Sequence, residues 1–142
     1  MPAEIQDFMT REWTPENVRR FGRAGPEMWA RTRSYLAAYE KDELVGAAVY
    51  YTQAGVANLS ELLVAAHKRR QGIGGALVEE FERRARASGC HKLVLKTYWD
   101  EKAVGFYRQH GFAVEAVLYC DLHQVDMCRM AKFLETTADS RL

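Results

Sequence analysis

The sequence predicts an α/β protein in which helices flank a mixed β-sheet of about six strands. A helical opening is followed by strand-like segments, and these lead into one strongly amphipathic helical segment. A further strand, a shorter helix and two last strands complete the order. This order differs from the regular alternation of a parallel βαβ ladder, so the sheet is expected to contain both antiparallel and parallel pairs.

Bulk properties narrow the class of protein. The 142 residues fit a single domain, residues 1–142, and 48% of them are hydrophobic and 27% charged. A net charge of +1 gives no reason to expect a nucleic acid or an anionic membrane as partner. No apolar run approaches the roughly 20 residues that span a bilayer. The N-terminus lacks the pattern of a secretory signal, and the three cysteines lack metal-like spacing, so we expect a cytoplasmic protein without a metal.

The first 30 residues are predicted to be helical. Thr14 is a candidate N-cap with Pro15 at the first helical position, and Gly22 is a candidate end. A second short helix is expected to begin near Pro26. No convincing strand precedes these helices.

The remaining elements follow from hydrophobic periodicity and turn residues. An amphipathic helix is expected over residues 75–87, and Asp100 is expected to cap a short helix that ends at Gly111. Strands are expected at residues 34–39, 44–51, 56–65, 91–97, 112–120 and 125–133.

The Gly-Ile-Gly-Gly turn of residues 72–75 lies between a strand and a helix. Glycine lets the backbone approach an anion closely, and the first N–H groups of a helix are unpaired and carry the positive end of the helix dipole. Arg69 and Arg70 add donors for phosphate oxygens. The turn is therefore a candidate phosphate-binding site.

Residue identities exclude two kinds of nucleotide site at this turn. A Walker loop requires Gly-Lys-Ser/Thr, which the chain lacks here. The dinucleotide fingerprint requires a third glycine where Leu77 stands, and the acidic residue expected about 20 positions later is missing.

The wider pattern resembles the Gcn5-related N-acetyltransferase (GNAT) superfamily. Arg69-x-x-Gly72-x-Gly74 matches the acetyl-CoA motif of that family, and Ala103-x-x-Phe106-Tyr107-x-x-x-Gly111-Phe112 matches its later helix. The resemblance extends over residues 61–112 and implies the family's acyl-CoA N-acyltransferase fold, here without an evident first strand. It also implies acetyl-CoA as the acyl donor and a small-molecule or peptide amine as the acceptor.

The resemblance further implies where the donor lies. The pyrophosphate is expected on backbone N–H groups of residues 70–75, and the pantetheine arm is expected to pair with residues 62–64 like an added strand. The N–H of Leu63 or Val64 is expected to polarise the thioester carbonyl. The implied cofactor-binding residues are Leu62, Leu63, Val64, Arg69, Arg70, Gln71, Gly72, Ile73, Gly74, Gly75, Asp100 and Tyr107.

Two residues are candidates for catalysis. Tyr107 occupies the position of the family's general acid, but a phenol near pKa 10 protonates a thiol near 8.5 uphill by about 2 kcal/mol in water. We therefore expect Tyr107 to donate a hydrogen bond to the developing thiolate. Glu61 is the candidate base, acting directly or through water, or else an anchor for a cationic acceptor. Its alternative role is that of a solvent-facing residue paired with a lysine, and Ser60 or Asn58 with a water chain would then replace it.

The resulting hypothesis is an N-acetyltransferase in which the amine attacks the thioester directly in a ternary complex. One alternative is a non-catalytic sensor of acyl-CoA on the same fold. Another is a nucleic-acid-binding domain that uses the basic run of residues 67–70, which the near-neutral charge disfavours. The apolar segment 125–134 permits a homodimer through the C-terminal strands, as in many relatives.

Overall fold

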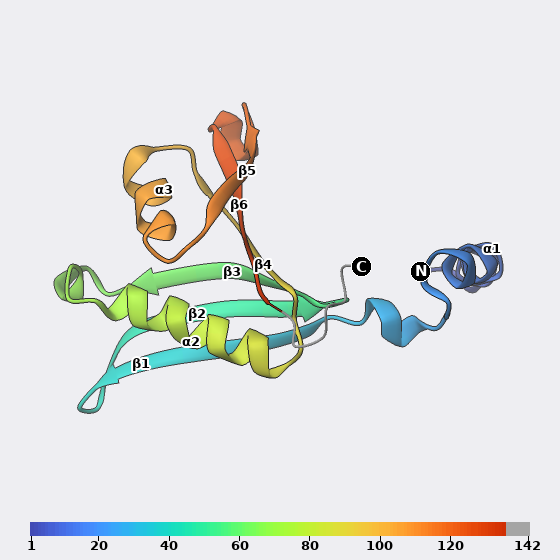
Figure 1. Ribbon diagram of the computed structural model, residues 1–142, viewed down its shortest axis with the longest axis horizontal. Helices are drawn as coiled ribbons and strands as arrows, with labels where there is room; N and C mark the ends of the chain where they lie inside the picture. The colour runs from blue at the N-terminus through green and yellow to red at the C-terminus, as the bar shows by residue number, and fades with distance from the viewer. Residues whose placement is uncertain (136–142) are drawn as a thin grey trace. The chain divides into compact units, whose positions relative to one another are not determined.

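The computed structural model, which describes residues 1–135, separates the chain into two compact units between Ala30 and Arg31. Each unit is described by itself. The first contains the N-terminal helices, and the second contains the complete sheet with the two remaining α-helices (Figure 1). In the described residues, no helix is both long and apolar enough to cross a membrane.

The N-terminal unit consists of helix α1 (Ala3–Phe21) and the 3₁₀ helix η1 (Pro26–Trp29). The predicted helix start at Thr14 is wrong, because Pro15 lies inside α1. The helix continues through this proline although proline lacks a backbone donor and disfavours a helix interior. The predicted end at Gly22 is confirmed, since this residue adopts a left-handed conformation with φ of 73°.

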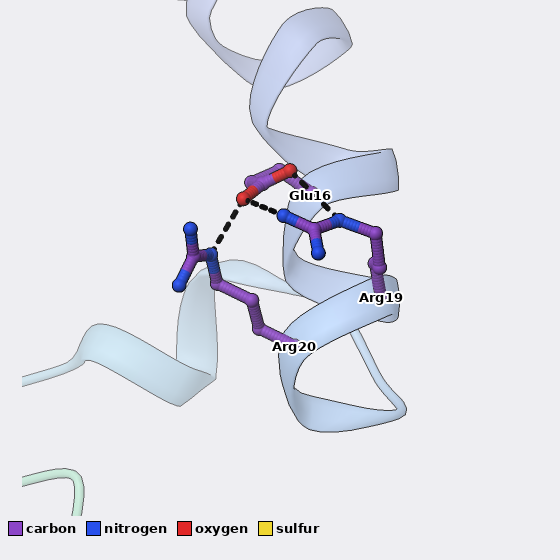
Figure 2. Close-up of polar contacts among 3 residues, drawn as sticks. All are labelled: Glu16, Arg19 and Arg20. Atoms are coloured by element: carbon purple, nitrogen blue, oxygen red, sulfur yellow. Dashed lines mark hydrogen bonds and ion pairs between the residues drawn. The ribbon is translucent and has the colours of Figure 1, made fainter.

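One carboxylate organises the second half of α1. The Arg19 Nη2 and the Arg20 Nε donate hydrogen bonds of 2.6 Å and 2.5 Å to the same Glu16 oxygen, Oε1 (Figure 2). The hydrogen bonds from Arg19 and then Arg20 lower the pKa of Glu16. These pairs span three and four residues, which is the spacing that brings side chains together on a helix surface.

The sheet of the second unit has six strands in the order β1-β2-β3-β4-β6-β5. All neighbouring pairs are antiparallel except β3 and β4, which run parallel. The predicted mixed sheet of about six strands is thus confirmed. The strands are β1 (Thr32–Glu40), β2 (Glu43–Gln53), β3 (Val56–Val64), β4 (Lys92–Tyr98), β5 (Ala113–Leu118) and β6 (Met127–Phe133).

Helices α2 (Ile73–Ala87) and α3 (Glu101–Arg108) complete the core, with short 3₁₀ turns at Ala66–Lys68 (η2) and Leu122–Gln124 (η3). The apolar stripe of α2 predicted from its periodicity is confirmed, because Leu77, Val78, Phe81 and Ala85 are buried. They pack with side chains of the strands and with Val104 of α3 in one cluster. This packing holds the beginning of α2 against the end of β3, where the predicted donor site lies.

Candidate active site

Strands β3 and β4 pair over only part of their length and then separate (Figure 1). The parallel register runs from Val56 opposite Lys92 to Leu59 opposite Leu95 and ends there. Beyond Leu59, β3 continues to Val64 with β2 on its other side. Residues 60–64 therefore present an unpaired strand edge toward β4, the kind of edge to which an extended amide chain can add.

A β-bulge marks the point of separation. Val49 of β2 lies opposite Glu61, while Tyr50 lies opposite Leu59, so Ser60 is the extra residue of β3. A bulge bends the strand and increases its twist, which turns the end of β3 away from β4. The sequence-based expectation of a separated strand edge at residues 62–64 agrees with this geometry.

The bulge also determines which side chains share a face. Leu62 packs against the core on the α2 side of the sheet, so its neighbours Glu61 and Leu63 lie on the opposite face. Leu63 is 67% exposed, and Glu61 is exposed as well. No hydrogen bond or ion pair joins the Glu61 side chain to another residue of the described chain. The lysine partner considered for it is not found within residues 1–135.

The glycine turn leaves the first turn of α2 without a side-chain cap. Gly72 is the N-cap of α2 with φ of 83°, and Arg70 also has a positive φ of 65°. The first intrahelical hydrogen bond is donated by the Ala76 N–H to the Gly72 carbonyl. The N–H groups of residues 73–75 precede it and have no partner within the helix, and no side chain caps them. They point outward at the positive end of the helix dipole, where an anion can bind.

Two glycines of α2, which have no Cβ atom, allow β3, α2 and α3 to approach one another closely beside this turn. A Cβ on Gly74 would lie 3.3 Å from Phe106 Cζ of α3 and 3.6 Å from Val64 Cγ2 of β3. A Cβ on Gly75 would lie 3.1 Å from His110 Cε1. Glycine at these two positions thus lets α3 approach the first turn of α2.

Gly46 of β2 has the same role on the sheet side. A Cβ there would lie 3.0 Å from Ile73 Cγ2 and 3.1 Å from Leu77 Cδ1. The first turn of α2 therefore rests directly on the sheet at this glycine. Gly46 is not among the predicted site residues, although a glycine inside a predicted strand is a known signal of close approach.

Within the described chain, the basic run of residues 67–70 contains two residues that pair with carboxylates and two that do not. His67 Nε2 lies 2.8 Å from Glu43 Oε1, and Lys68 Nζ lies 3.0 Å from Glu40 Oε2. Arg69 donates from Nε to the Val64 carbonyl oxygen at 3.3 Å. Neither Arg69 nor Arg70 has a carboxylate partner in the described residues, so both arginines are available for phosphate oxygens.

Tyr107 lies on α3 with its ring among aromatic neighbours. The ring meets Phe106 edge-on at 4.9 Å and Phe112 at 5.9 Å, and the side chain packs against the core. Burial raises the pKa of the Tyr107 phenol above its ordinary value of 10.0. The phenol therefore stays protonated at neutral pH, as a hydrogen-bond donor must.

Asp100 caps α3, as expected. Its Oδ1 accepts a hydrogen bond of 2.8 Å from the Ala103 N–H. The carboxylate is thus committed to the helix that carries Tyr107. Contact of Asp100 with the donor stays a prediction.

Two partly exposed tryptophans, Trp29 and Trp99, belong to different units. Trp29 lies in a groove of about 560 Å³ within the N-terminal unit, and its ring is 5.5 Å from that of Phe21. Trp99 follows the end of β4 and is 41% exposed. The other side chains that line the groove include Met9, Trp13 and Pro26.

Residues 1–135 contain no group of three or more His, Cys, Asp or Glu side chains that could hold a metal. The candidate site consists instead of a strand edge, a helix N-terminus, two arginines and a half-buried phenol. Such an arrangement suits an elongated donor that carries amides at one end and phosphates at the other.

Comparison with known proteins agrees with this geometry. Residues 3–112 match the acetyltransferase (GNAT) family. Blasticidin-S acetyltransferase from Streptomyces morookaense is 36% identical over 98 residues, which cover 66% of this chain and 71% of that protein. The uncharacterized N-acetyltransferase YjcF of Bacillus subtilis (strain 168) is 28% identical over 80 residues, which cover 56% of each chain.

Known structures share the fold. An acetyltransferase from Bacillus cereus ATCC 14579 superposes with a TM-score of 0.70 at 18% identity and covers 94% of both chains. A GNAT family acetyltransferase from Elizabethkingia anophelis, determined with acetyl-CoA bound, superposes with a TM-score of 0.68 at 20% identity. That match covers 72% of this chain and 76% of the other. With the family match spanning most of its length, the chain belongs to the acetyltransferase (GNAT) family and is an N-acetyltransferase.

Proposed function

We propose that this enzyme transfers an acetyl group from acetyl-CoA to a primary amine by direct attack in a ternary complex. The observation that carries the proposal is the unpaired edge of residues 60–64, which leads directly into the glycine turn. The two features are adjacent in the chain, and Arg69 links the turn to the carbonyl of Val64. A coenzyme A thioester has the matching sequence of groups, with amides in its pantetheine arm and phosphates beyond.

The residues of the chain would divide the work as follows. The N–H groups of residues 73–75 and the guanidinium groups of Arg69 and Arg70 bind phosphate oxygens. The strand edge pairs with the pantetheine amides, and the N–H of Leu63 or Val64 donates to the thioester oxygen, which gains charge during the attack. Bound acetyl-CoA supplies the activated acetyl group.

The two groups proposed to act on protons, Tyr107 and Glu61, lie on opposite faces of the sheet. Tyr107 packs on the α2 side, while Glu61 lies on the other face of β3. A base on one face can take the proton from the amine, and a donor on the other can stabilise the leaving thiolate. Glu61 acts directly or through a water, and Tyr107 donates a hydrogen bond because its pKa lies above its ordinary value.

The acceptor and the cellular setting belong to the same proposal. The relative from Streptomyces morookaense carries blasticidin S in its name, so that compound is the first acceptor to test on this chain. We propose a cytoplasmic location, which is consistent with the free thiols of Cys90, Cys120 and Cys128. Pairing of His67 and Lys68 with carboxylates makes nucleic acid a poor partner.

The test is thiol release from acetyl-CoA with blasticidin S and a panel of polyamines, amino acids and aryl amines. We expect Tyr107→Phe to lower kcat by about 100-fold and Glu61→Gln to lower it similarly. Arg69→Ala should weaken coenzyme A binding by about tenfold, measured by calorimetry. The matched controls Tyr119→Phe and Arg83→Ala, which change exposed side chains elsewhere, should leave both quantities unchanged.

The outcomes of these measurements distinguish the enzyme from the sensor and test the role of each residue. Tight coenzyme A binding without thiol release from any amine would support the sensor alternative. Wild-type rates in the Tyr107 and Glu61 variants would remove these residues from the mechanism. Unchanged coenzyme A affinity in Arg69→Ala would remove that arginine from the phosphate site.

A further inference from the structure

Strand β1 forms one edge of the sheet, and its outer side has no strand partner in the described residues. It is nine residues long, and its side chains alternate regularly between the core and the opposite face. The irregularity near its end lies in the partner strand, because Ala38 pairs with Gly46 and Tyr39 with Leu44, which leaves Val45 as the extra residue of β2. A long, regular edge is a ready template for another strand.

A groove of about 370 Å³ runs beside this edge on the α2 face. Its lining is apolar near the strand and charged on the helix side, where Glu80 and Arg84 stand. A strand added to β1 would direct every second side chain into this groove. The apolar part of the lining consists of Leu36, Ala38, Ala76 and Leu77.

The described chain contains no strand that could occupy the edge. All six of its strands already belong to the sheet, and the segment before Arg31 is helical. A strand added at this edge would therefore come from outside the described residues. It needs small or apolar side chains on the groove face and charges that complement the two ends of β1.

The sequence of β1 meets both requirements when it pairs with itself in antiparallel orientation. Pairing centred on Leu36 places Ala38 opposite Ser34 of the second copy on the groove face, and Tyr35 opposite Ala37 on the other face. At the two ends, Arg33 comes opposite Tyr39 of the second copy, where a guanidinium can lie over the ring.

Charge order favours the same arrangement. The N-terminal end of β1 carries Arg31 and Arg33, and the turn after it carries Glu40, Asp42 and Glu43 beside Lys41. Lys68 pairs with Glu40 and His67 with Glu43, so three carboxylates and two lysines leave this end with a net negative charge when His67 is neutral. Antiparallel pairing brings the basic end of each copy beside the acidic end of the other. A two-fold axis perpendicular to the sheet also keeps both α2 helices on one face, where their Glu80 and Arg84 side chains border the junction.

We propose that two copies of this chain join through β1 in antiparallel pairing centred on Leu36, forming one continuous sheet. The proposal does not rest on the transferase activity. It concerns a different edge from the C-terminal strands β5 and β6.

Sedimentation velocity over a concentration series tests the proposal. The wild-type mass should rise from the 16.3 kDa of one chain toward twice that value. Tyr39→Arg removes both cross-strand contacts and places like charges opposite each other, so the dimer dissociation constant should rise by about tenfold or more. Arg33→Glu combined with Tyr39→Arg restores opposite charges and should return most of the affinity. Tyr39 is 63% exposed, so these changes leave the core intact.

Tyr119→Arg is the matched control, since it makes the same change in an exposed tyrosine after β5 and should not alter the dimer. Hydrogen exchange should show concentration-dependent protection of residues 32–40. A monomer at every concentration would overturn the proposal, and so would a dimer weakened by Tyr119→Arg but not by Tyr39→Arg. Weakening by Tyr39→Arg without recovery in the double variant would overturn the register and hence the proposal.

Discussion

Tyr107 shows how a single residue acquires its role from its surroundings. Its position in the sequence matches the family's general acid, and its packing against Phe106 and Phe112 explains why its pKa is raised. A higher pKa makes the phenol a poorer proton donor to a thiolate, although it remains a hydrogen-bond donor over a wider pH range. The structure thus strengthens the interpretation as a hydrogen-bond donor.

Titration of Tyr107 checks this interpretation. The absorbance titration of the wild type minus that of Tyr107→Phe should have its midpoint above pH 10. Because the folded-state pKa exceeds the unfolded value, the contribution of this group to the free energy of unfolding is complete below about pH 10 and is lost as the pH rises through the folded-state pKa. A difference midpoint at or below pH 10 would contradict the burial of the phenol.

Gly46 is a second residue whose importance comes from a close contact. Gly46→Ala places a methyl group within 3.1 Å of Ile73 and Leu77 side-chain atoms, and we expect it to lower the free energy of unfolding by about 1–3 kcal/mol. Coenzyme A binding should weaken too, because the first turn of α2 must move. Urea denaturation and calorimetry measure the two effects.

Gly105→Ala is the control for that substitution. A Cβ at Gly105 of α3 would have no atom within 4 Å, so alanine there should raise the free energy of unfolding by about 0.5–1 kcal/mol. Equal effects of the two alanine substitutions would show that contact with α2 is not what requires glycine at Gly46.

At the scale of elements, Asp100 caps α3, the helix that carries Tyr107. Asp100→Ala removes the acceptor for the Ala103 N–H and should lower the free energy of unfolding by about 1 kcal/mol, whereas Asp100→Asn keeps an acceptor and should cost little. Thermal unfolding separates the two variants. If the asparagine variant lost as much stability as the alanine variant, the cap would not explain the role of Asp100.

The separation of β3 and β4 is also a property of elements. Both strands are evident in the sequence from their hydrophobic patterns, and both were predicted with nearly the observed bounds. Where they stop pairing was not predictable, because the register depends on the bulge at Ser60, which forms only against β2. The same bulge determines the face of β3 on which Glu61 lies, so this face was not predictable from the sequence either.

At the scale of the whole molecule, the hydrophobic core and the donor site lie in the same unit. Every member of the buried cluster comes from Leu36 or later, and Met28 is the one buried hydrophobic residue described before Arg31. We expect residues 31–142 alone to unfold cooperatively and to bind coenzyme A within about threefold of the full chain, a difference below 1 kcal/mol. Denaturation curves and calorimetry test this, and loss of cooperative unfolding would contradict it.

The sequence by itself determined the order of helices and strands and the position of the glycine turn between a strand and a helix. These features depend on local periodicity and on residue types within a few positions of one another. The tertiary structure alone decided that His67 and Lys68 pair with carboxylates, whereas Arg69 and Arg70 meet no carboxylate within residues 1–135. It also decided that Gly46 supports the turn from the sheet. It also placed Tyr107 and Glu61 on opposite sides of the sheet. These outcomes depend on contacts between residues far apart in the chain, and such contacts exist only after strands pair and helices pack.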